Sequence, residues 1–368
     1  MDKIAVFIEH NTINNSPSII NLLDFLSDIY EVHLFLRHID LKKATVLDKK
    51  NIKVIDLGNR RISPIYLIEK IKSRWNSFNH YICIDPHGFV LCKKLFPKAR
   101  PIYYSLELYM KDDYFGLYYP KHIMNFERKN INSIKALVIQ SEEKEILFRK
   151  DYNLSNNIPS LLIPVTYQGP SVREKATKVR DKYQIGSDKK IALHLGGIAE
   201  WFSCIELAVT FSKLEKWALF FQGYSDQKYL AELTDTLVRY NINNVFISDE
   251  IYDSVEDIDP IIMSCDLGIA WYNDISIGFR TAGKSSGKIA GYLRFGLPVI
   301  AKKYLSTIEA IEDTGCGICV DDFEEISTAL KKVEEDFNRY SENAANEYNK
   351  TYRFENYKER LISLIENG

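Results

Sequence analysis

The sequence has no long hydrophobic run. None of its apolar segments approaches the roughly 18–20 residues that a helix needs to cross a bilayer. The start, Met1–Ile8, carries no long apolar core of the kind found in signal peptides. We therefore expect a cytoplasmic protein that lies, at most, at the inner face of a membrane.

Cysteine is sparse, and its six residues are scattered mostly through apolar segments. They are Cys83, Cys92, Cys204, Cys265, Cys316 and Cys319. The last two have the spacing of half a zinc site, but no second pair follows and no histidine lies near them in the sequence. We expect buried free thiols in a reducing compartment and no metal site.

A strong net charge is also missing. The formal charge of −2 argues against a dedicated nucleic-acid binder, which is normally basic overall. The charge is uneven, however, because residues 1–165 carry 24 Lys and Arg against 18 Asp and Glu, while the remainder carries 24 against 32. A basic N-terminal half fits contact with an anionic membrane or an acidic lipid-linked acceptor, and an ordinary solvated surface is equally compatible with it.

The sequence does contain two successive runs of short apolar segments that alternate with amphipathic ones such as Pro64–Trp75 and Tyr119–Ser133. This alternation is typical of parallel strands joined by helices. The strands predicted in the first run are Ile4–Glu9, Glu31–Leu36, Lys53–Leu57, Tyr81–Asp85, Arg100–Ser105 and Ala136–Gln140, and the run ends near Leu161–Val165.

The alternation restarts after the charged segment Val172–Gln184. The strands predicted there are Lys190–Leu195, Ala218–Gln222, Asn244–Ile247, Asp266–Ala270, Pro298–Ala301 and Gly317–Val320. Since 368 residues suit two domains better than one, we predict an α/β protein with two Rossmann-like, doubly wound domains that face a cleft.

The most informative segment runs from position 285 to 301 and reads Ser-Ser-Gly-Lys-Ile-Ala-Gly-Tyr-Leu-Arg-Phe-Gly-Leu-Pro-Val-Ile-Ala. It predicts a loop, a short helix ended by Gly296 and Pro298, and a buried strand. The residues at the predicted helix start are Ser285, Ser286, Gly287 and Lys288. Free backbone N–H groups, hydroxyl groups and a lysine at a helix N-terminus favour an anion, above all a phosphate.

Two further features point to phosphates. Gly196 and Gly197 follow the first strand of the second half, where glycines let the backbone approach a diphosphate closely. Arg280 and Lys284 precede Lys288 and add positive charge. We expect these three cations to neutralise a bound diphosphate.

Residues Gly278–Ser285 also fit the G-x₄-G-K-[ST] pattern of a P-loop, which would make the chain an NTPase. Against this alternative, a P-loop normally follows the first strand of its domain, and the Gly-Leu-Pro-Val-Ile sequence from Gly296 is left unexplained. Both interpretations place phosphates at this segment.

The order of these features resembles the nucleotide-sugar site of GT-B glycosyltransferases, particularly family 4. The C-terminal half of that family carries a (P/S)-x-K-(hydrophobic)₂-E-Y-x-x-x-G-x-P-V-I-A pattern, and the match extends over nearly the whole chain in architecture. The resemblance implies an acceptor-binding domain in residues 1–165, a nucleotide-sugar domain in 166–345, and a C-terminal helix in 346–368 that returns to the first domain.

The resemblance also implies further site residues. Gly223 and Tyr224 would line the cleft, and Ile251 and Tyr252 would lie where relatives hold the base. In the first domain, His87 would face the acceptor. The second strand-end candidate there is Glu107, which we expect to accept a hydrogen bond from a sugar hydroxyl or to act as a base. His10 and Asn11 stand where relatives place a Gly-rich acceptor loop.

The expected reaction is the transfer of a sugar from a nucleotide-diphosphate sugar, a UDP-sugar by preference, to a glycan or lipid-linked acceptor of a bacterial surface polysaccharide. No other cofactor is expected. Asp257-Ile-Asp259 resembles a metal-binding D-x-D motif, but helix capping suffices to explain it, and phosphate neutralisation would be metal-independent. Family behaviour implies retention of configuration, whereas a basic Glu107 would imply inversion.

The chain departs from the family pattern at two positions. Family 4 enzymes carry two glutamates eight positions apart, and here Gly283 and Gly291 take their places. The loop after Gly197 also lacks the usual Arg and Lys. These departures leave two alternatives open, a non-catalytic nucleotide-sugar-binding subunit and a nucleotide-sugar epimerase on the same fold.

Overall fold

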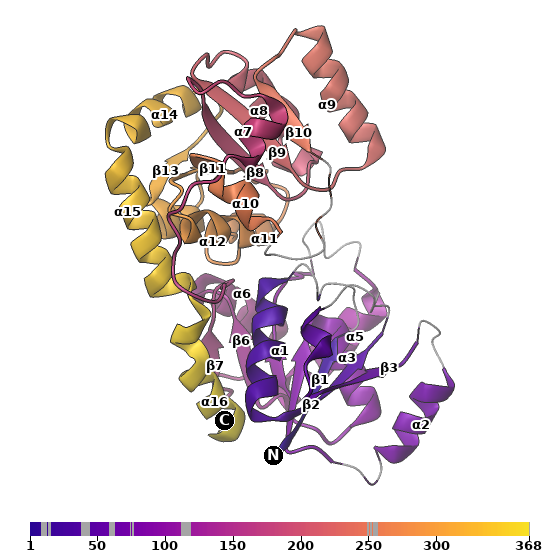
Figure 1. Cartoon of the computed structure of the whole chain (residues 1–368). Coiled ribbons are helices and arrows are strands. Elements are labelled where there is room, and N and C mark those ends of the chain that lie inside the picture. The colour runs from indigo at the N-terminus through magenta and orange to yellow at the C-terminus, as the bar shows by residue number, and fades with distance from the viewer. Residues whose placement is uncertain are drawn as a thin grey trace. The chain divides into compact units, whose positions relative to one another are not determined.

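The structure is a computed structural model of the chain, which describes residues 1–8, 13, 16–37, 45–58, 63–73, 75, 77–111, 119–248, 250, 252 and 257–367 (Figure 1). The chain divides into two compact units. The first comprises Met1–Thr166 with Phe354–Gly368, and the second comprises Tyr167–Arg353. The boundaries predicted from the sequence lie at 165/166 and 345/346.

The first unit contains a seven-stranded sheet in the order β3-β2-β1-β4-β5-β6-β7, with every neighbouring pair parallel. Its strands are β1 (Lys3–Ile8), β2 (Glu31–Leu36), β3 (Ile52–Asp56), β4 (His80–Ile84), β5 (Ile102–Tyr104), β6 (Ala136–Ile139) and β7 (Ser160–Leu162). Alternate residues of β1 face opposite sides and are buried on both, so helices must cover both faces of this sheet.

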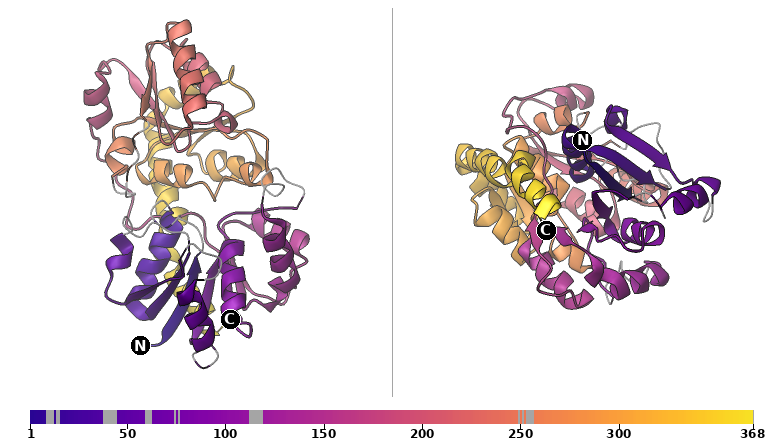
Figure 2. Two further views of the ribbon diagram at one scale, coloured as in Figure 1. Left: turned by 90° about the vertical axis from the view of Figure 1, so that its right-hand side faces the viewer. Right: turned by 90° about the horizontal axis from the view of Figure 1, so that it is seen from below.

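The helices of the first unit cover the two faces of its sheet, as the two views of Figure 2 show. They are α1 (Pro17–Ile29), α2 (Pro64–Lys72), α3 (Asp85–Leu95), α5 (Lys121–Asn130), α6 (Glu142–Tyr152) and α16 (Lys358–Asn367). Side chains of α1 and α16, among them Leu22 and Leu361, share one hydrophobic core with Val6 of β1. The opposite face holds rings such as Phe89 of α3 and Phe148 of α6, both packed on Tyr103.

The second unit contains a six-stranded parallel sheet in the order β10-β9-β8-β11-β12-β13. Its strands are β8 (Lys190–Leu195), β9 (Trp217–Gln222), β10 (Val245–Ser248), β11 (Leu267–Ala270), β12 (Val299–Lys302) and β13 (Gly317–Val320). The two sheets have the same order along the chain, which is the doubly wound order.

The helices of the second unit also form a layer on each face of the sheet. They are α7 (Lys178–Tyr183), α8 (Cys204–Phe211), α9 (Gln227–Arg239), α10 (Asp259–Met263), α11 (Ile277–Arg280), α12 (Gly287–Arg294), α13 (Leu305–Thr307), α14 (Ile326–Glu335) and α15 (Phe337–Glu347). One core joins α7, α10 and α12 to the sheet. Another joins α8, α9 and α14 to its other face.

The strand order has a consequence for function. In each sheet the order in which strands are added reverses between two neighbouring parallel strands, β1 and β4 in the first unit and β8 and β11 in the second. Ligands of doubly wound sheets bind beyond the carboxyl ends of the strands at such a switch point. The loops after β4, β8 and β11 are therefore the first places to look for a site.

All six cysteines are buried free thiols. Within the described part of the chain, no helix has the length and apolarity needed to traverse a lipid bilayer.

Candidate functional site

The N-terminus of α12 lies at the switch point of the second unit. Ser286 caps this helix, since its Oγ accepts a hydrogen bond from the backbone N–H of Ile289 at 3.2 Å. The N–H groups of Gly287 and Lys288 lie in the first turn and have no intrahelical acceptor. Gly296, with φ of +64°, ends the segment as the sequence predicts.

Lys288 turns toward the glycine loop after β8. A Cβ atom on Gly196 would lie 3.8 Å from the lysine Nζ, so the ammonium group faces that backbone directly. Nζ also lies 4.0 Å from the ring centre of Phe202 and 5.0 Å from that of Tyr272. The atom is buried, and within the described residues it has no hydrogen-bond partner.

The buried position changes the charge of this lysine. Burial lowers the pKa of Lys288 from 10.5 to about 7, and the nearby thiol of Cys204 opposes this shift only in part. Two aromatic faces attract the ammonium group but cannot accept a hydrogen bond from it in the way an oxygen does. Among the described residues, no carboxylate pairs with the ammonium group of Lys288.

Glycines let the loops after β8 and β9 approach each other closely beside this lysine. Gly223 follows β9 with φ of +153°, and a Cβ atom there would lie 1.8 Å from the carbonyl oxygen of Gly196. Only glycine fits this approach, which keeps the two strand-end loops in contact. Gly197 packs on the ring of Phe202, since a Cβ atom added to Gly197 would lie 3.1 Å from the ring atom Cε2.

His194, in β8, supports the same loop from below. Its Nε2 donates to the carbonyl oxygen of Gly197 at 3.1 Å, which holds the loop backbone. Burial and then the nearby Lys288 lower the pKa of His194 well below its usual value. The histidine is therefore neutral at physiological pH and acts as a positioning residue.

The other residues predicted for the phosphate are partly engaged elsewhere. Arg280 is exposed and forms an ion pair with Asp274. The hydroxyl group of Ser285 donates to the carbonyl oxygen of Thr281 at 3.1 Å, and that of Ser286 is hydrogen-bonded to Tyr272 as well as capping α12. Lys284 is half-buried.

The residues predicted to line the base and the cleft are described in part. Tyr224 is 68% exposed after β9. The hydroxyl group of Tyr252 donates to Glu250 at 2.9 Å, and the ammonium group of Lys178 lies over its ring at 5.1 Å. Ile251 lies outside the described residues, as do His10 and Asn11 of the first unit.

The P-loop alternative is wrong. Gly278 to Arg280 belong to the helix α11, so the segment does not form a phosphate-cradling loop. The N–H of Gly283 is already bonded to Ser306 Oγ at 3.2 Å. In the D-x-D segment, Asp259 is the first residue of α10 and its carboxylate pairs with Arg294 at 3.1 Å.

The two glycines that replace the family glutamates differ in their surroundings. A Cβ atom on Gly283 would lie 2.0 Å from the carbonyl oxygen of Ser306, so no side chain fits there without a shift of the backbone. A Cβ atom on Gly291 would lie 3.4 Å from the hydroxyl oxygen of Tyr167, an ordinary contact. That hydroxyl group donates to the carbonyl oxygen of Gly287 at 3.1 Å and supports α12.

A second group of polar residues lies at the carboxyl ends of β4, β5 and β6 in the first unit. Asp85, directly after β4, accepts hydrogen bonds from the N–H groups of Leu106 at 2.7 Å and Glu107 at 3.2 Å. These bonds tie the loop after β5 to the start of α3. Burial, and next the charge of Glu107, raise the pKa of Asp85 from 3.8 to about 7.

Glu107 and Lys144 complete this group. The protein atoms around Glu107 raise the pKa of its carboxyl group, and Lys144 opposes the shift. Lys144, in the first turn of α6, is 2% exposed, and burial lowers the pKa of its ammonium group while Glu107 and Asp85 raise it. Two carboxyl groups and one amine thus interact at the strand ends, as in sites that hold or move a proton.

His87 stands in the first turn of α3, beside this group. Its Nδ1 is hydrogen-bonded to the hydroxyl group of Tyr119, and the two rings lie 5.1 Å apart. Tyr119 in turn packs on Tyr109 with ring centres 4.2 Å apart. His87 and Glu107 therefore lie at the strand ends of one unit, among aromatic rings that suit a sugar.

Several residues of these two sites were not singled out from the sequence. Asp85 lies two residues before the predicted His87, and Lys144 lies in the first turn of the helix that follows a predicted strand, so an inspection of every strand end would find both. Phe202 and Tyr272 carry no such signal, because only the folded chain brings these rings to Lys288.

Comparison with known proteins agrees with this architecture. The structure matches HepE of Anabaena in complex with UDP and glucose, with a TM-score of 0.76 and 14% identity over 99% of both chains. It matches sucrose-phosphate synthase of Thermosynechococcus elongatus with a TM-score of 0.73 and 13% identity over 99% of this chain and 98% of that one. WaaG, a glycosyltransferase involved in lipopolysaccharide biosynthesis, matches with a TM-score of 0.68 and 14% identity over the whole of both chains.

These likenesses define the class by its fold. The chain has the GT-B fold, and the predicted resemblance to GT-B glycosyltransferases is confirmed. More particularly, residues 252–363 match the family model of the glucosyltransferase 3-like C-terminal domain. A search of the curated protein sequences gives no match.

Proposed function

We propose that the chain is a metal-independent glycosyltransferase that moves a sugar from a UDP-sugar to a hydroxyl group of a glycan or lipid-linked acceptor. The observation that carries the proposal is the buried ammonium group of Lys288, which faces Gly196 beside the N-terminus of α12 without a hydrogen-bond partner within the described residues. A bound diphosphate would give this ammonium group its hydrogen-bond acceptors and its counter-charge. HepE, which shares the fold, is described in complex with UDP and with UDP-glucose.

The proposed reaction breaks the bond between the anomeric carbon and the diphosphate oxygen, and the electron pair leaves with the diphosphate. Lys288 and the first-turn N–H groups of α12 neutralise the charge that grows on this oxygen. The acceptor oxygen forms the new bond, and its proton passes to the departing phosphate in a retaining enzyme. In an inverting enzyme the proton would pass to Glu107, whose pKa burial raises above its ordinary value.

The setting that we propose is synthesis of a bacterial surface polysaccharide. WaaG, a structural relative, is described as involved in lipopolysaccharide biosynthesis, and this supports the setting by analogy. The acceptor would meet the first unit at His87, Asp85 and Glu107.

The test of the donor site is the Lys288→Ala variant. We expect it to bind UDP-glucose at least about a hundredfold more weakly, because it removes the buried charge that faces the diphosphate. Isothermal titration of UDP-glucose measures this, and the matched control is Lys331→Ala, an exposed lysine on α14 of the same unit. Unchanged affinity in Lys288→Ala, with the control also unchanged, would contradict the proposal.

A non-catalytic binding subunit is the second candidate, and the packing at Gly283 favours it, since the position expected to hold a glutamate near the donor sugar is closed by Ser306. Slow hydrolysis of UDP-glucose distinguishes the two. A transferase releases UDP in the absence of acceptor, whereas a binding subunit retains the intact donor. A thermal-shift comparison with GDP-, ADP- and CDP-sugars would identify the nucleotide.

A further inference from the structure

Helix α2 of the first unit exposes an apolar face. Five large hydrophobic side chains on this helix and just after it are between 47% and 76% exposed. They are Ile65, Leu67, Ile68, Ile71 and Trp75. Ile65, Ile68 and Ile71 follow one another at helical spacing and share a face of α2, and Trp75 lies just beyond the end of the helix.

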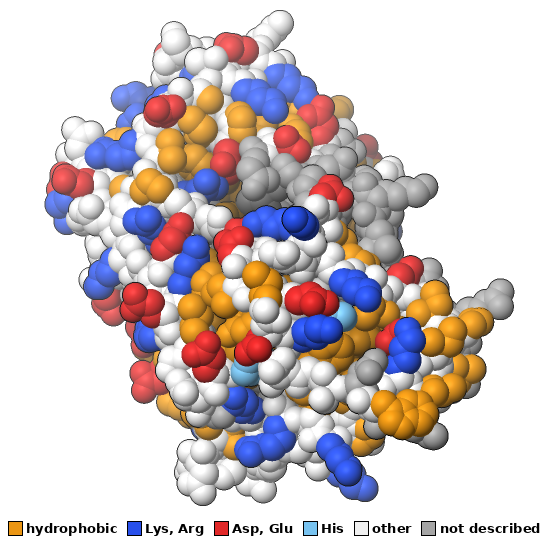
Figure 3. Space-filling view, turned by 60° about the horizontal axis from the view of Figure 1, so that its bottom comes forward, with side chains coloured by type: hydrophobic (Ala, Val, Ile, Leu, Met, Phe, Trp, Pro, Cys, Tyr) orange, Lys and Arg blue, Asp and Glu red, His pale blue; other side chains and the backbone are white. Residues whose placement is uncertain are grey.

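The other side chains of α2 determine the charge beside this apolar face. Tyr66 is the side chain of α2 that is buried, and the guanidinium group of Arg37 lies over its ring at 5.1 Å. The acidic residue of α2, Glu69, is paired with Lys72 at 2.8 Å. The helix therefore presents apolar side chains and lysines but little free negative charge. In Figure 3, hydrophobic side chains gather where α2 lies, with Lys and Arg side chains beside them.

A cationic pocket adjoins this face. Its volume is about 940 Å³, and it lies at the amino ends of β4, β5 and β6, opposite to Asp85 and Glu107. The basic residues that line it are Lys70, Lys94, Lys98, Arg100 and Lys135, and no acidic residue is among its described lining residues. Lys135 donates to the carbonyl oxygen of Ile365 at 2.7 Å.

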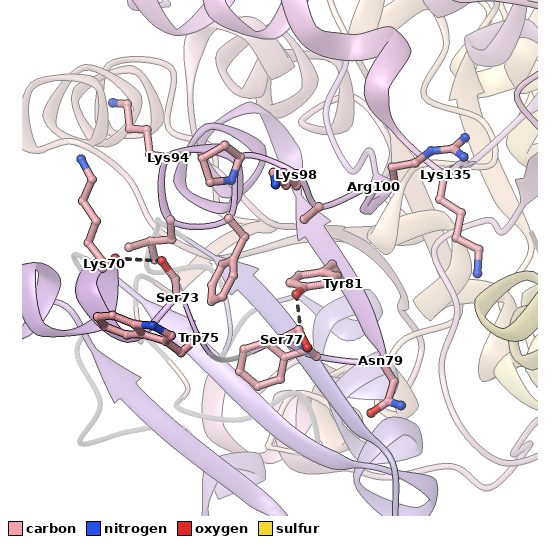
Figure 4. Close-up of a pocket in the computed structure, with 15 residues that line it drawn as sticks. Lys70, Ser73, Trp75, Ser77, Asn79, Tyr81, Lys94, Lys98, Arg100 and Lys135 are labelled. Atoms are coloured by element: carbon pink, nitrogen blue, oxygen red, sulfur yellow. Dashed lines mark hydrogen bonds between the residues drawn. The ribbon is translucent and has the colours of Figure 1, made fainter.

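The floor of the pocket is aromatic. Phe78, Tyr81 and Phe96 pack against one another with ring centres 5.5–5.9 Å apart. Figure 4 shows Lys70, Lys94, Lys98 and Arg100 along one side of the pocket, with Trp75 and Tyr81 on the other. A second cavity of about 400 Å³ shares Trp75 and Phe78 with the first and adds Lys3, Lys53 and Lys72.

We propose that α2 and the adjoining cationic pocket form a docking surface for an anionic lipid bilayer. The apolar face of α2 enters the boundary between headgroups and acyl chains, and the surrounding lysines and Arg100 meet the lipid phosphates. Charge complementarity selects this occupant, because a neutral apolar partner would leave the cations beside it without counterions. The surface is separate from the donor site, so its function does not rest on glycosyl transfer.

The test is co-sedimentation of the full chain with vesicles of three parts phosphatidylcholine to one part phosphatidylglycerol. We expect binding to these vesicles, weaker binding at high salt, and little binding to pure phosphatidylcholine. The Lys94→Glu/Lys98→Glu variant should bind at least about twentyfold more weakly, since each lysine near an anionic surface contributes roughly fivefold. The Ile71→Ser/Trp75→Ser variant should lose about tenfold.

Matched controls lie on the second unit. Lys331→Glu/Lys332→Glu changes the same charge on α14, and Val238→Ser removes an equally exposed apolar side chain, 77% exposed, from α9. Equal losses in the controls would overturn the proposal. So would release of the protein from vesicles by millimolar inorganic phosphate at constant ionic strength, which would indicate a phosphate site. Self-association in sedimentation velocity that the Ile71→Ser/Trp75→Ser variant abolishes would indicate a second copy instead of a bilayer.

Discussion

At the scale of single residues, Lys288 decides what the donor site can do. Its ammonium group is buried between two aromatic rings and the backbone of Gly196, where water cannot solvate it well. A buried amine without an anion is costly, and such cost is typical of groups kept for binding rather than for stability. Gly223 contributes to the same site because it has no side chain, which allows the loop after β9 to contact the backbone of Gly196 after β8.

The cost at Lys288 predicts a dependence of stability on pH. The pKa of Lys288 is about 7 in the folded protein and 10.5 in the unfolded chain. Between these two pH values the unfolded chain binds more protons than the folded protein does. The free energy of unfolding therefore rises with pH between pH 7 and pH 10.5. Below pH 7, Lys288 is charged in both the folded and the unfolded state, and the free-energy cost of burying its charge has its full value. Lys288→Met should therefore stabilise the ligand-free protein by about 3 kcal/mol at pH 6, with the gain fading toward pH 10.

Urea unfolding at several pH values measures this difference. Lys331→Met on α14, which removes an exposed lysine, serves as the control and should give a difference near zero at every pH. A Lys288→Met protein that is less stable than the parent at pH 6 would show that the amine has a partner in solution.

At the scale of elements, α12 owes its position to contacts with the strands on both sides of the switch point. The hydroxyl group of Tyr292 accepts from the N–H of Leu195 at 2.8 Å and lies 3.0 Å from the carbonyl oxygen of Leu193, to which it donates. Gly268 of β11 leaves room for the ring, since a Cβ atom there would lie 2.1 Å from it. The helix that carries Lys288 is thus bound to the strand that leads into Gly196.

The same substitution at two glycines tests this packing. Gly283→Ala should destabilise the second unit by roughly 2 kcal/mol or more, because its Cβ would meet the backbone of Ser306. Gly291→Ala lies inside α12 with space for a methyl group, and it should stabilise by roughly 0.5–1 kcal/mol, the usual gain of alanine over glycine in a helix. Thermal unfolding of the pair measures the contrast, and equal effects at both sites would contradict the described packing.

At the scale of the whole molecule, the two units are built differently along the chain. The second unit is one continuous segment, whereas the first combines the N-terminal residues with Phe354–Gly368. Phe354, Tyr357, Leu361 and Ile365 are buried in the core that α1 and β1 share. Four such side chains contribute about 6–12 kcal/mol on burial, which is comparable to the whole stability of a domain.

This difference predicts the behaviour of fragments. Residues 167–353 alone should fold and bind UDP-glucose, because their core is closed within one segment. Residues 1–166 alone should not fold cooperatively until a peptide of residues 354–368 is added. Circular dichroism melts of both fragments, with and without the peptide, measure this. A cooperative transition of residues 1–166 without the peptide would refute it.

Much of the fold could be predicted from the sequence because parallel strands are continuous apolar runs. The strands Glu31–Leu36, Lys190–Leu195 and Gly317–Val320 have the predicted bounds. Other strands differ from the prediction at their ends. The predicted strand Arg100–Ser105, for example, is β5 with the bounds Ile102–Tyr104. The reason is that hydrogen bonds to the neighbouring strands, and not hydrophobicity, decide where a strand ends.

The site could be predicted only in part. Strand-end loops point to Gly196, Lys288, His87 and Glu107, because the rule for doubly wound sheets acts on sequence order. The P-loop interpretation of Gly278–Ser285 was wrong, since a pattern of residue types does not tell a loop from the helical turn at α11.

The sequence by itself determined the alternation of strands and helices, the doubled parallel-sheet architecture and the helix start that bears Lys288, because periodicity, glycine and capping residues act over a few neighbouring positions. Only the tertiary structure decided that Phe202 and Tyr272 enclose that lysine, that Ser306 closes the position of Gly283, and that Asp85, Glu107 and Lys144 meet. These contacts join residues far apart in the chain, and their energies depend on burial, which no local pattern contains.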